Sequence, residues 1–240
     1  MSTLRLWLEG PMQAWGTASR FEVRSTDPVP SKSGVVGLLA AALGRTRSEP
    51  VGDLAAMRFG VRVVRSGSVL RDYQAVGAGS DGVAVASGAK GRGIVTERYY
   101  LQDAAFVVGF ESSDRPRLDA LHVAVARPRW PLGLGRRSCP PSVPIAMPGA
   151  IVEQSLVDAL AADWRPPGLA SPLPRLVAIE GVSTLALAAD RRLTTLVVED
   201  DDGTIEVADQ PMGAAFADRT FAARRVSHLY RIPESKERAA

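Results

Sequence analysis

The predicted fold is built outward from residues 4–16, LRLWLEGPMQAWG. Three leucines alternate with other residues in its first half, which is the period of two expected of a β-strand. Gly10 and Pro11 then end the strand, because glycine permits positive φ, while proline fixes φ and lacks an N–H. The chain therefore turns sharply and leaves the sheet in a set direction.

Three side chains that follow this turn are candidates for binding: Met12, Gln13 and Trp15. Gln13 offers two donors and an acceptor, and Trp15 offers a flat ring and one N–H. Such groups suit an unpaired base, since stacking on an aromatic ring contributes roughly 1–3 kcal/mol per base. The alternative is that Met12 and Trp15 pack under a loop as part of the core.

Composition is that of an ordinary globular protein. The 240 residues are 46% hydrophobic and 23% charged, enough for one large domain or a main domain with a smaller appendage. No apolar run has the roughly 18 residues of a membrane span, and no signal-peptide pattern opens the chain, so we expect a cytoplasmic protein. The single cysteine, Cys139, excludes an intrachain disulfide and any multi-cysteine metal site.

Charge is distributed unevenly along the chain. Residues 1–140 carry 19 Lys and Arg against 12 Asp and Glu, a net charge of +7, whereas residues 141–240 are net acidic. Nearly all the cations are arginine, which binds phosphate bidentately and stacks on bases. The first part of the chain is therefore expected to face an anion, although a coding bias toward G and C would also enrich arginine.

Residues 31–44 predict a buried helix that is apolar nearly all round. Ser31 or Ser33 can cap its first N–H groups, and Gly44 can adopt the left-handed stop. Free N–H groups, the positive end of the helix dipole and Lys32 could bind a phosphate at its start. Simple capping is the other interpretation.

Residues 59–101 predict a projecting hairpin. We expect strands at 59–65, 69–76 and 94–101, and six glycines lie among the 17 residues of 77–93. Such a long excursion in a compact domain is usually functional or disordered, so the hairpin of 69–101 is predicted to form a thumb. Lys90 and Arg92 lie near its return and could contact a phosphate, and Arg98, Tyr99 and Tyr100 interleave charge with aromatic rings.

The elements outside the thumb predict a ferredoxin-like fold. A central strand is expected at 104–110, a helix at 114–126 capped by Asp114, and a last strand near 130–132. Together with the earlier elements they give the order β-α-β-β-α-β, which is typical of this α+β, RRM-like class.

A second basic loop follows, GLGRRSCPP at residues 133–141. Its glycines, its hydroxyl group at Ser138 and its two guanidinium groups, Arg136 and Arg137, could converge on a phosphate. A surface turn with solvated arginines is the alternative.

Beyond residue 148 the sequence predicts a smaller β-rich unit, giving domains at 1–148 and 149–240. We expect a helix at 151–164, a proline-rich linker, and short strands near 175–181, 184–188, 193–199, 204–207 and 224–232. The acidic turn EDDDG at 199–203 is predicted to join two of these strands as a hairpin.

Four motifs together resemble a known family. They are GPMQAWG at 10–16, PSKSGVVGLLAAALG at 30–44, LRDYQAV at 70–76 and LGRRSCP at 134–140. In this order they resemble the RAMP family of CRISPR-associated proteins, and within it the subunit of type I-E Cascade complexes that holds the 5′ handle of the guide RNA.

The resemblance implies a ferredoxin-like RAMP body with an inserted thumb, without cofactor or metal. It further implies a hetero-oligomer with crRNA, the adjacent backbone subunit and the large subunit, near target DNA and away from membranes. Residues expected to contact the handle or steer the thumb are Met12, Gln13, Trp15, Lys32, Ser33, Arg71, Tyr73, Lys90, Arg92, Arg98, Tyr99, Arg136, Arg137 and Ser138.

The alternative function is that of a metal-independent endoribonuclease that processes repeat RNA, as some RAMP relatives are. Such a reaction needs a general base and acid, most often histidine. Only His122 and His228 are present, and both are expected to be structural. Gln74 stands where the family motif commonly has histidine, and it cannot titrate. A Cys139 nucleophile activated by the neighbouring arginines and a metal site in the 199–203 turn are weaker options.

Overall fold

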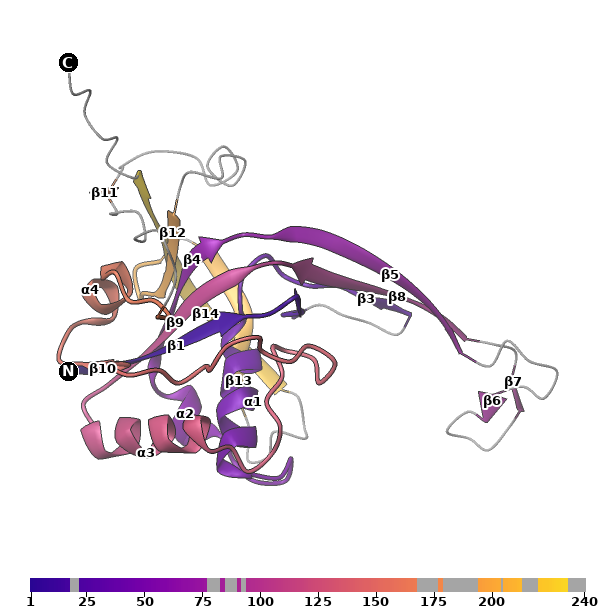
Figure 1. Ribbon diagram of the computed structural model, residues 1–240, viewed down its shortest axis with the longest axis horizontal. Coiled ribbons are helices and arrows are strands. Elements are labelled where there is room, and N and C mark those ends of the chain that lie inside the picture. The colour runs from indigo at the N-terminus through magenta and orange to yellow at the C-terminus, as the bar shows by residue number, and fades with distance from the viewer. Residues whose placement is uncertain are drawn as a thin grey trace, which may run out of the picture.

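A large antiparallel sheet organises the molecule (Figure 1). In spatial order it contains β10 (Ile151–Val152), β1 (Ser2–Glu9), β9 (Ala105–Ser112), β4 (Arg58–Arg65), β12 (Thr194–Glu199), β14 (Thr220–Ile232) and β11 (Val177–Ala178), and β13 (Ile205–Met212) also pairs with β14. This computed structural model describes residues 1–17, 22–76, 83–84, 90–91, 94–167, 177–178, 194–203, 205–212 and 220–232. The predicted α+β class, dominated by antiparallel pairing, is confirmed.

Helices cover both faces of the sheet. On one face lie α1 (Lys32–Leu43), α2 (Gly52–Ala55) and α3 (Arg115–Ala126), and on the other lies α4 (Leu156–Ala161). The leucines of β1 pack with α1 and α3 in the larger core cluster, whereas Trp7 packs with Leu156 and Leu160 of α4. No helix in the described residues is both long enough and apolar enough to span a bilayer.

β1 is buried on both faces, including its polar one. The Arg5 guanidinium donates hydrogen bonds to Gly149 O at 2.6 Å and Ala159 O at 3.3 Å, and it lies 4.8 Å from the centroid of the Trp164 ring. Burial lowers the pKa of Arg5 to about 10. The strand was predicted correctly, and the carbonyl groups of Gly149, before β10, and of Ala159, in α4, let its arginine be buried.

Two glycines of the sheet allow α4 to pack closely against it. Gly60 and Gly109 are register partners on β4 and β9. A Cβ atom would lie 2.8 Å from Leu160 Cδ1 at the first and 2.7 Å from Leu156 Cδ1 at the second. Any side chain there would push the helix outward, so the sheet is hollowed where α4 packs.

The thumb is a second sheet that projects from the body, as predicted (Figure 1). Its long hairpin joins β5 (Ser68–Val76) to β8 (Ile94–Gln102), and β2 (Met12–Gln13) and β3 (Val23–Arg24) also pair with β8. Farther out, β6 (Val83–Ala84) pairs with β7 (Lys90–Gly91). The chain enters the thumb through Gly67 and leaves it through Asp103, both with positive φ.

Three local predictions were wrong. No strand forms at 130–132; β10 instead pairs with β1 on the edge opposite β9, and the helix expected over 151–164 is shortened to α4. The turn at 199–203 does not reverse the chain, because β12 and β13 both run antiparallel to β14, along different parts of it. The strand expected at 184–188 lies outside the described residues.

The C-terminal strands extend the sheet of the body. β12 pairs directly with β4, so the sheet is continuous across the boundary expected near residue 148.

Candidate nucleic-acid interface

Gln13 and Trp15 belong to the core, which corrects the expectation that they are exposed. Gln13 is 0% exposed and Trp15 is 1% exposed. The Gln13 amide donates to Leu8 O at 3.2 Å and Ala104 O at 2.8 Å, and accepts from Trp15 Nε1 at 3.0 Å. Their polar atoms are satisfied internally, so neither side chain can receive a base. Met12 is half-buried against the same core.

The start of α1 is occupied by the protein itself. Ser31 caps the helix by accepting from Gly34 N at 3.3 Å, and Gly44 ends it at φ 77°, both as predicted. The anion at the helix N-terminus is the Asp209 carboxylate, which accepts from Lys32 N at 2.6 Å. Of the two interpretations, capping is therefore the one observed, and a phosphate site at Lys32 and Ser33 is excluded in this conformation.

The cations beside that helix start are also paired. The Lys32 ammonium, 1% exposed, lies 2.8 Å from Glu199, and burial lowers its pKa in spite of this partner. Arg224 binds Asp209 through two hydrogen bonds, of 2.6 and 3.0 Å. These ion pairs hold β12, β13 and β14 against α1.

The thumb places the predicted residues on two opposite faces, because successive side chains of a strand alternate. Arg71 and Tyr99 are register partners, and Tyr73 opposes Glu97. Arg71 pairs with Glu97, which also accepts from the Tyr99 hydroxyl at 3.3 Å and whose pKa Arg71 lowers. This face, which we call the tyrosine face, thus has its charges paired, with Tyr73 63% exposed.

The other face of the thumb is basic. Arg98 and Tyr100 alternate with Tyr99 and so point to this side, and Arg24 of β3 is the parallel register partner of Arg98. The Arg136 guanidinium lies 4.7 Å from the Tyr100 ring centroid and donates to Arg24 O at 2.8 Å. We call Arg24, Arg98 and Arg136 the arginine face.

Buried hydrogen-bond donors without a partner occur beside the arginine face, as they do at Arg5 and Arg224. Arg98 Nε, Arg136 Nη1 and the hydroxyl of Thr96 have no hydrogen-bond partner within the described residues. No arginine of this face forms an ion pair with a described carboxylate. Because no described carboxylate neutralises its guanidinium groups, the face is suited to an anionic ligand.

The loop at 133–141 lies against this face through Arg136. Arg137 and Ser138 are exposed in the same loop. Lys90 lies on β7, farther along the thumb, and Arg92 is outside the described residues. Sequence reasoning missed Arg24 and Tyr100, since only the pairing of β3 with β8 brings Arg24 beside Arg98, and only the packing of the 133–141 loop brings Arg136 over the Tyr100 ring.

Three of the candidate catalytic groups, Cys139, His122 and Gln74, make contacts within the fold. Cys139 is fully buried, and burial raises the pKa of its thiol, opposite to the expected activation. The ring of His122 lies 3.2 Å from Met147 O, and His228 sits on β14. Gln74 donates to Asp72 at 2.6 Å. Among the described residues, no cluster of His, Cys, Asp or Glu is able to hold a metal ion.

Comparison with known proteins finds one matching family and one similar protein of known name. Residues 3–227 match the family described as CRISPR-associated protein (Cas_Cas5). The CRISPR system Cascade subunit CasD of Escherichia coli (strain K12) is 37% identical over 158 residues, which cover 60% of this chain and 69% of that protein.

Two solved structures are also similar to this chain. One, titled "Crystal structure of Cas protein", is 40% identical with a TM-score of 0.68, covering 97% of this chain and 96% of that one. A chain of a "CRISPR RNA-guided surveillance complex" is 30% identical with a TM-score of 0.71, covering 97% and 91%.

Replacing Asp209 should destabilise the protein strongly. Asp209→Ala leaves the buried Arg224 charge and the α1 start without their anion, a change that typically costs about 3–5 kcal/mol. The measurement is urea unfolding, with Asp119→Ala as control, since Asp119 forms only an exposed pair with Arg115. The double variant Asp209→Leu with Arg224→Met should recover part of the loss, and equal losses from Asp209→Ala and Asp119→Ala would contradict the assignment.

Cys139 should be inert in the folded protein. Because the thiol is buried with a raised pKa, iodoacetamide at about pH 8 should modify the native chain at least about tenfold more slowly than the unfolded chain. Intact mass spectrometry over time measures both rates. Native alkylation as fast as that of the unfolded chain would restore the thiol as a reactive group.

Proposed function

This chain belongs to the Cas5 family of CRISPR-associated proteins, and on that basis we propose that it is a non-catalytic crRNA-binding subunit of a type I-E Cascade surveillance complex. In this proposal it holds the 5′ handle of the guide RNA and caps one end of the backbone. Its neighbours are the adjacent backbone subunit and the large subunit, with target DNA nearby. The CasD relative and the surveillance-complex structure support this assignment.

The body is proposed to be ferredoxin-like. The strands β1, β4, β9 and β10, with α1 after β1 and α3 after β9, follow the order β-α-β-β-α-β along the chain. β10 takes the last position, which sequence analysis gave to residues 130–132. The thumb is the insertion between β4 and β9.

The observation that carries the RNA-binding proposal is the arginine face. It has guanidinium groups from three separate segments and lacks described carboxylate partners. RNA phosphates would pair with the guanidinium groups of Arg24, Arg98 and Arg136, which have no described carboxylate partner, through charge-assisted hydrogen bonds. Single-stranded RNA is commonly bound by such backbone contacts together with stacking on Arg planes.

In this proposal, residues of the thumb and of the 133–141 loop contact different partners. Arg98, Arg136 and the exposed Arg137 contact the handle backbone, and Ser138 adds a hydroxyl in the same loop. Arg136 also positions β3, because it binds the Arg24 carbonyl. The tyrosine face, with its charges paired and Tyr73 exposed, fits contact with a protein subunit, since exposed apolar surface commonly marks such interfaces.

Removing two arginines should weaken handle binding. Arg98→Ala with Arg137→Ala removes charged hydrogen bonds worth about 1.5–3 kcal/mol each, so the Kd for handle RNA should rise about a hundredfold or more. The slope of log K against log salt should also fall by about 0.7 for each phosphate that the variant no longer binds. Fluorescence anisotropy with labelled handle RNA measures both quantities.

The matched control is Arg71→Ala, on the opposite face of the same hairpin. Its side chain is exposed and paired with Glu97, so its loss should change the Kd by less than about threefold. The arginine face is refuted as the RNA site if Arg71→Ala weakens binding as much as the double variant, or if the double variant binds normally.

The protein should bind repeat RNA without cleaving it. Cys139 is buried and Gln74 cannot titrate, so neither supplies the general base or acid that this reaction needs. Incubation with repeat RNA in EDTA, followed by denaturing gels, should show stoichiometric binding and intact RNA. Turnover to a 2′,3′-cyclic phosphate would favour the endoribonuclease instead.

A further inference from the structure

We propose that the side chains of Asp72 and Gln74, on the arginine face of the thumb, recognise a base of the bound RNA and select one that carries an amino group, adenine or cytosine. The inference rests on the proposed RNA-binding function and adds base specificity to it. Contacts to phosphate position a nucleic acid without reading its sequence, so specificity needs groups that meet the edges of bases. The arginines of this face supply the first kind of contact, and Asp72 with Gln74 supplies the second.

Strand register places both side chains beside the arginines. Asp72 is the register partner of Arg98, and Gln74 is the register partner of Thr96, the next residue of β8 on the same face. Side chains that are opposite or diagonal neighbours on one face of a sheet lie within reach of one another. A nucleotide whose phosphate binds Arg98 can therefore place its base over Asp72 and Gln74.

One hydrogen bond fixes the orientation of the Gln74 amide. Gln74 Nε2 donates to Asp72 Oδ2 at 2.6 Å. A carboxylate only accepts hydrogen bonds, so the nitrogen of the amide must face Asp72 and the oxygen must face away from it. Gln74 thus presents one acceptor, Oε1, and one remaining N–H in a set order.

The remaining polar groups of the pair are open to a ligand. Among the described residues, the contact between them is the only hydrogen bond that either side chain forms. Both residues are half-buried, but Gln74 Oε1 and Asp72 Oδ1 are not among the polar atoms that the protein encloses without a partner. Both oxygens therefore reach solvent, and the pair offers two acceptors and one donor.

Two acceptors beside one donor match a base that has an amino group next to a ring nitrogen. Adenine has this arrangement at N6 and N7, and glutamine binds these two atoms through two hydrogen bonds. Cytosine has it at N4 and N3, an edge that is unpaired and accessible in single-stranded RNA. Uracil and guanine carry a carbonyl oxygen in place of that amino group, and this oxygen would face the oxygens of Gln74 and Asp72 without a hydrogen bond.

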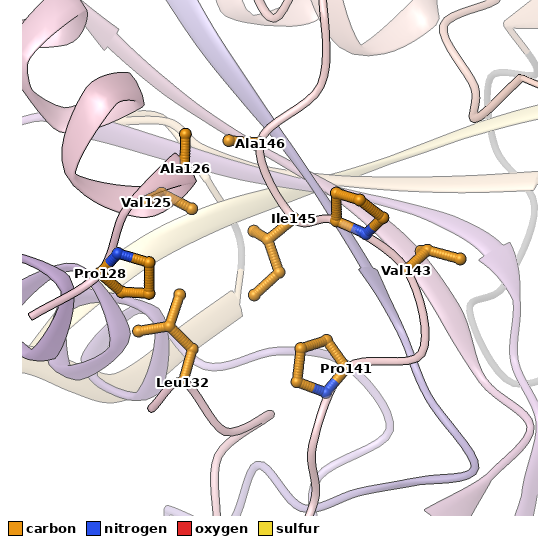
Figure 2. A pocket seen from close by; sticks show the side chains of 9 residues that line it. Val125, Ala126, Pro128, Leu132, Pro141, Val143, Ile145 and Ala146 are labelled. Carbon is orange, nitrogen blue, oxygen red and sulfur yellow. The ribbon is translucent and has the colours of Figure 1, made fainter. Parts of the chain in front are cut away.

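A groove beside the end of α3 has no comparable side chains (Figure 2). It has a volume of about 360 Å³, and the side chains that line it are those of Val, Ala, Pro, Leu and Ile. None of these side chains donates or accepts a hydrogen bond, so they cannot distinguish an amino group from a carbonyl oxygen. Base discrimination is therefore assigned to the thumb.

The test measures base preference in the full-length protein. In labelled handle RNA, each adenosine is replaced singly by inosine and each cytidine by uridine, which exchanges the amino group for a carbonyl oxygen. At one position the exchange should weaken binding to the wild type at least about fivefold, the smallest loss expected from a bidentate contact. Fluorescence anisotropy gives the dissociation constants, and the kind of exchange that is effective tells adenine from cytosine.

Two variants assign the effect to the pair. Gln74→Leu removes the donor and the acceptor at similar size, so the same exchange should cost less than about twofold. Asp72→Asn leaves the amide free to turn, because asparagine both donates and accepts, and should reduce the wild-type preference at least about twofold.

The matched control is Gln154→Leu, at an exposed glutamine between β10 and α4, which should keep the preference of the wild type. Unfolding midpoints equal to that of the wild type show that the variants fold.

Two outcomes would overturn the inference alone. One is that every exchange costs Gln74→Leu as much as it costs the wild type, and the other is that Gln154→Leu loses the preference equally. In both cases handle RNA still binds the wild type, and Arg98→Ala with Arg137→Ala still weakens it. If the wild type does not bind handle RNA, the proposed function fails and the inference fails with it.

Discussion

The buried amide of Gln13 is the interaction on which the relation of thumb to body depends. It lies where the chain passes between the two sheets, and it joins the end of β1, through Leu8 O, to Ala104 O between β8 and β9. Through its oxygen it also fixes the Trp15 indole, whose ring fits against Gly34 so closely that a Cβ there would lie 2.9 Å from it. One side chain thus connects the central strand, the base of the thumb and the start of α1. Because such an amide is costly to leave unsatisfied, it favours one orientation of the thumb over others.

A second constraint links the two ends of the chain. A helix N-terminus attracts an anion, and the sequence leaves open whether that anion is a ligand or a side chain. Here a carboxylate from β13, Asp209, takes the position, and Arg224 neutralises it. The same choice between internal and external partners arises at Gln13 and at Arg98. At Gln13 the partners are internal, whereas Arg98 has no described carboxylate partner, so ion pairing within the fold, rather than residue type, distinguishes Arg224 from Arg98.

The features predicted correctly are those encoded by neighbours in the sequence. Ser31, Gly44 and Asp114 cap their helices as expected, because a cap requires only a side chain or a φ angle within one turn. The thumb hairpin likewise follows from two strands joined by a glycine-rich excursion. The features that were predicted wrongly, or not at all, depend on contacts between segments that are distant in the sequence. Gly60 and Gly109 carry no local signal of the helix that packs on them, and two-residue strands such as β10 and β3 are too short for any periodicity to show. The buried state of Gln13 and Trp15 was missed for the same reason.

The difference between the two faces of the thumb follows from how their carboxylates are used. On the tyrosine face, Glu97 pairs with Arg71, so the cation is neutralised within the hairpin. On the arginine face, Asp72 is the register partner of Arg98, but it accepts from Gln74 Nε2 at 2.6 Å and forms no ion pair with that arginine. Gln74 therefore has a physical role at a position where a histidine would titrate. The neutral Gln74 amide donates to the Asp72 carboxylate, and the Arg98 guanidinium has no ion pair among the described residues.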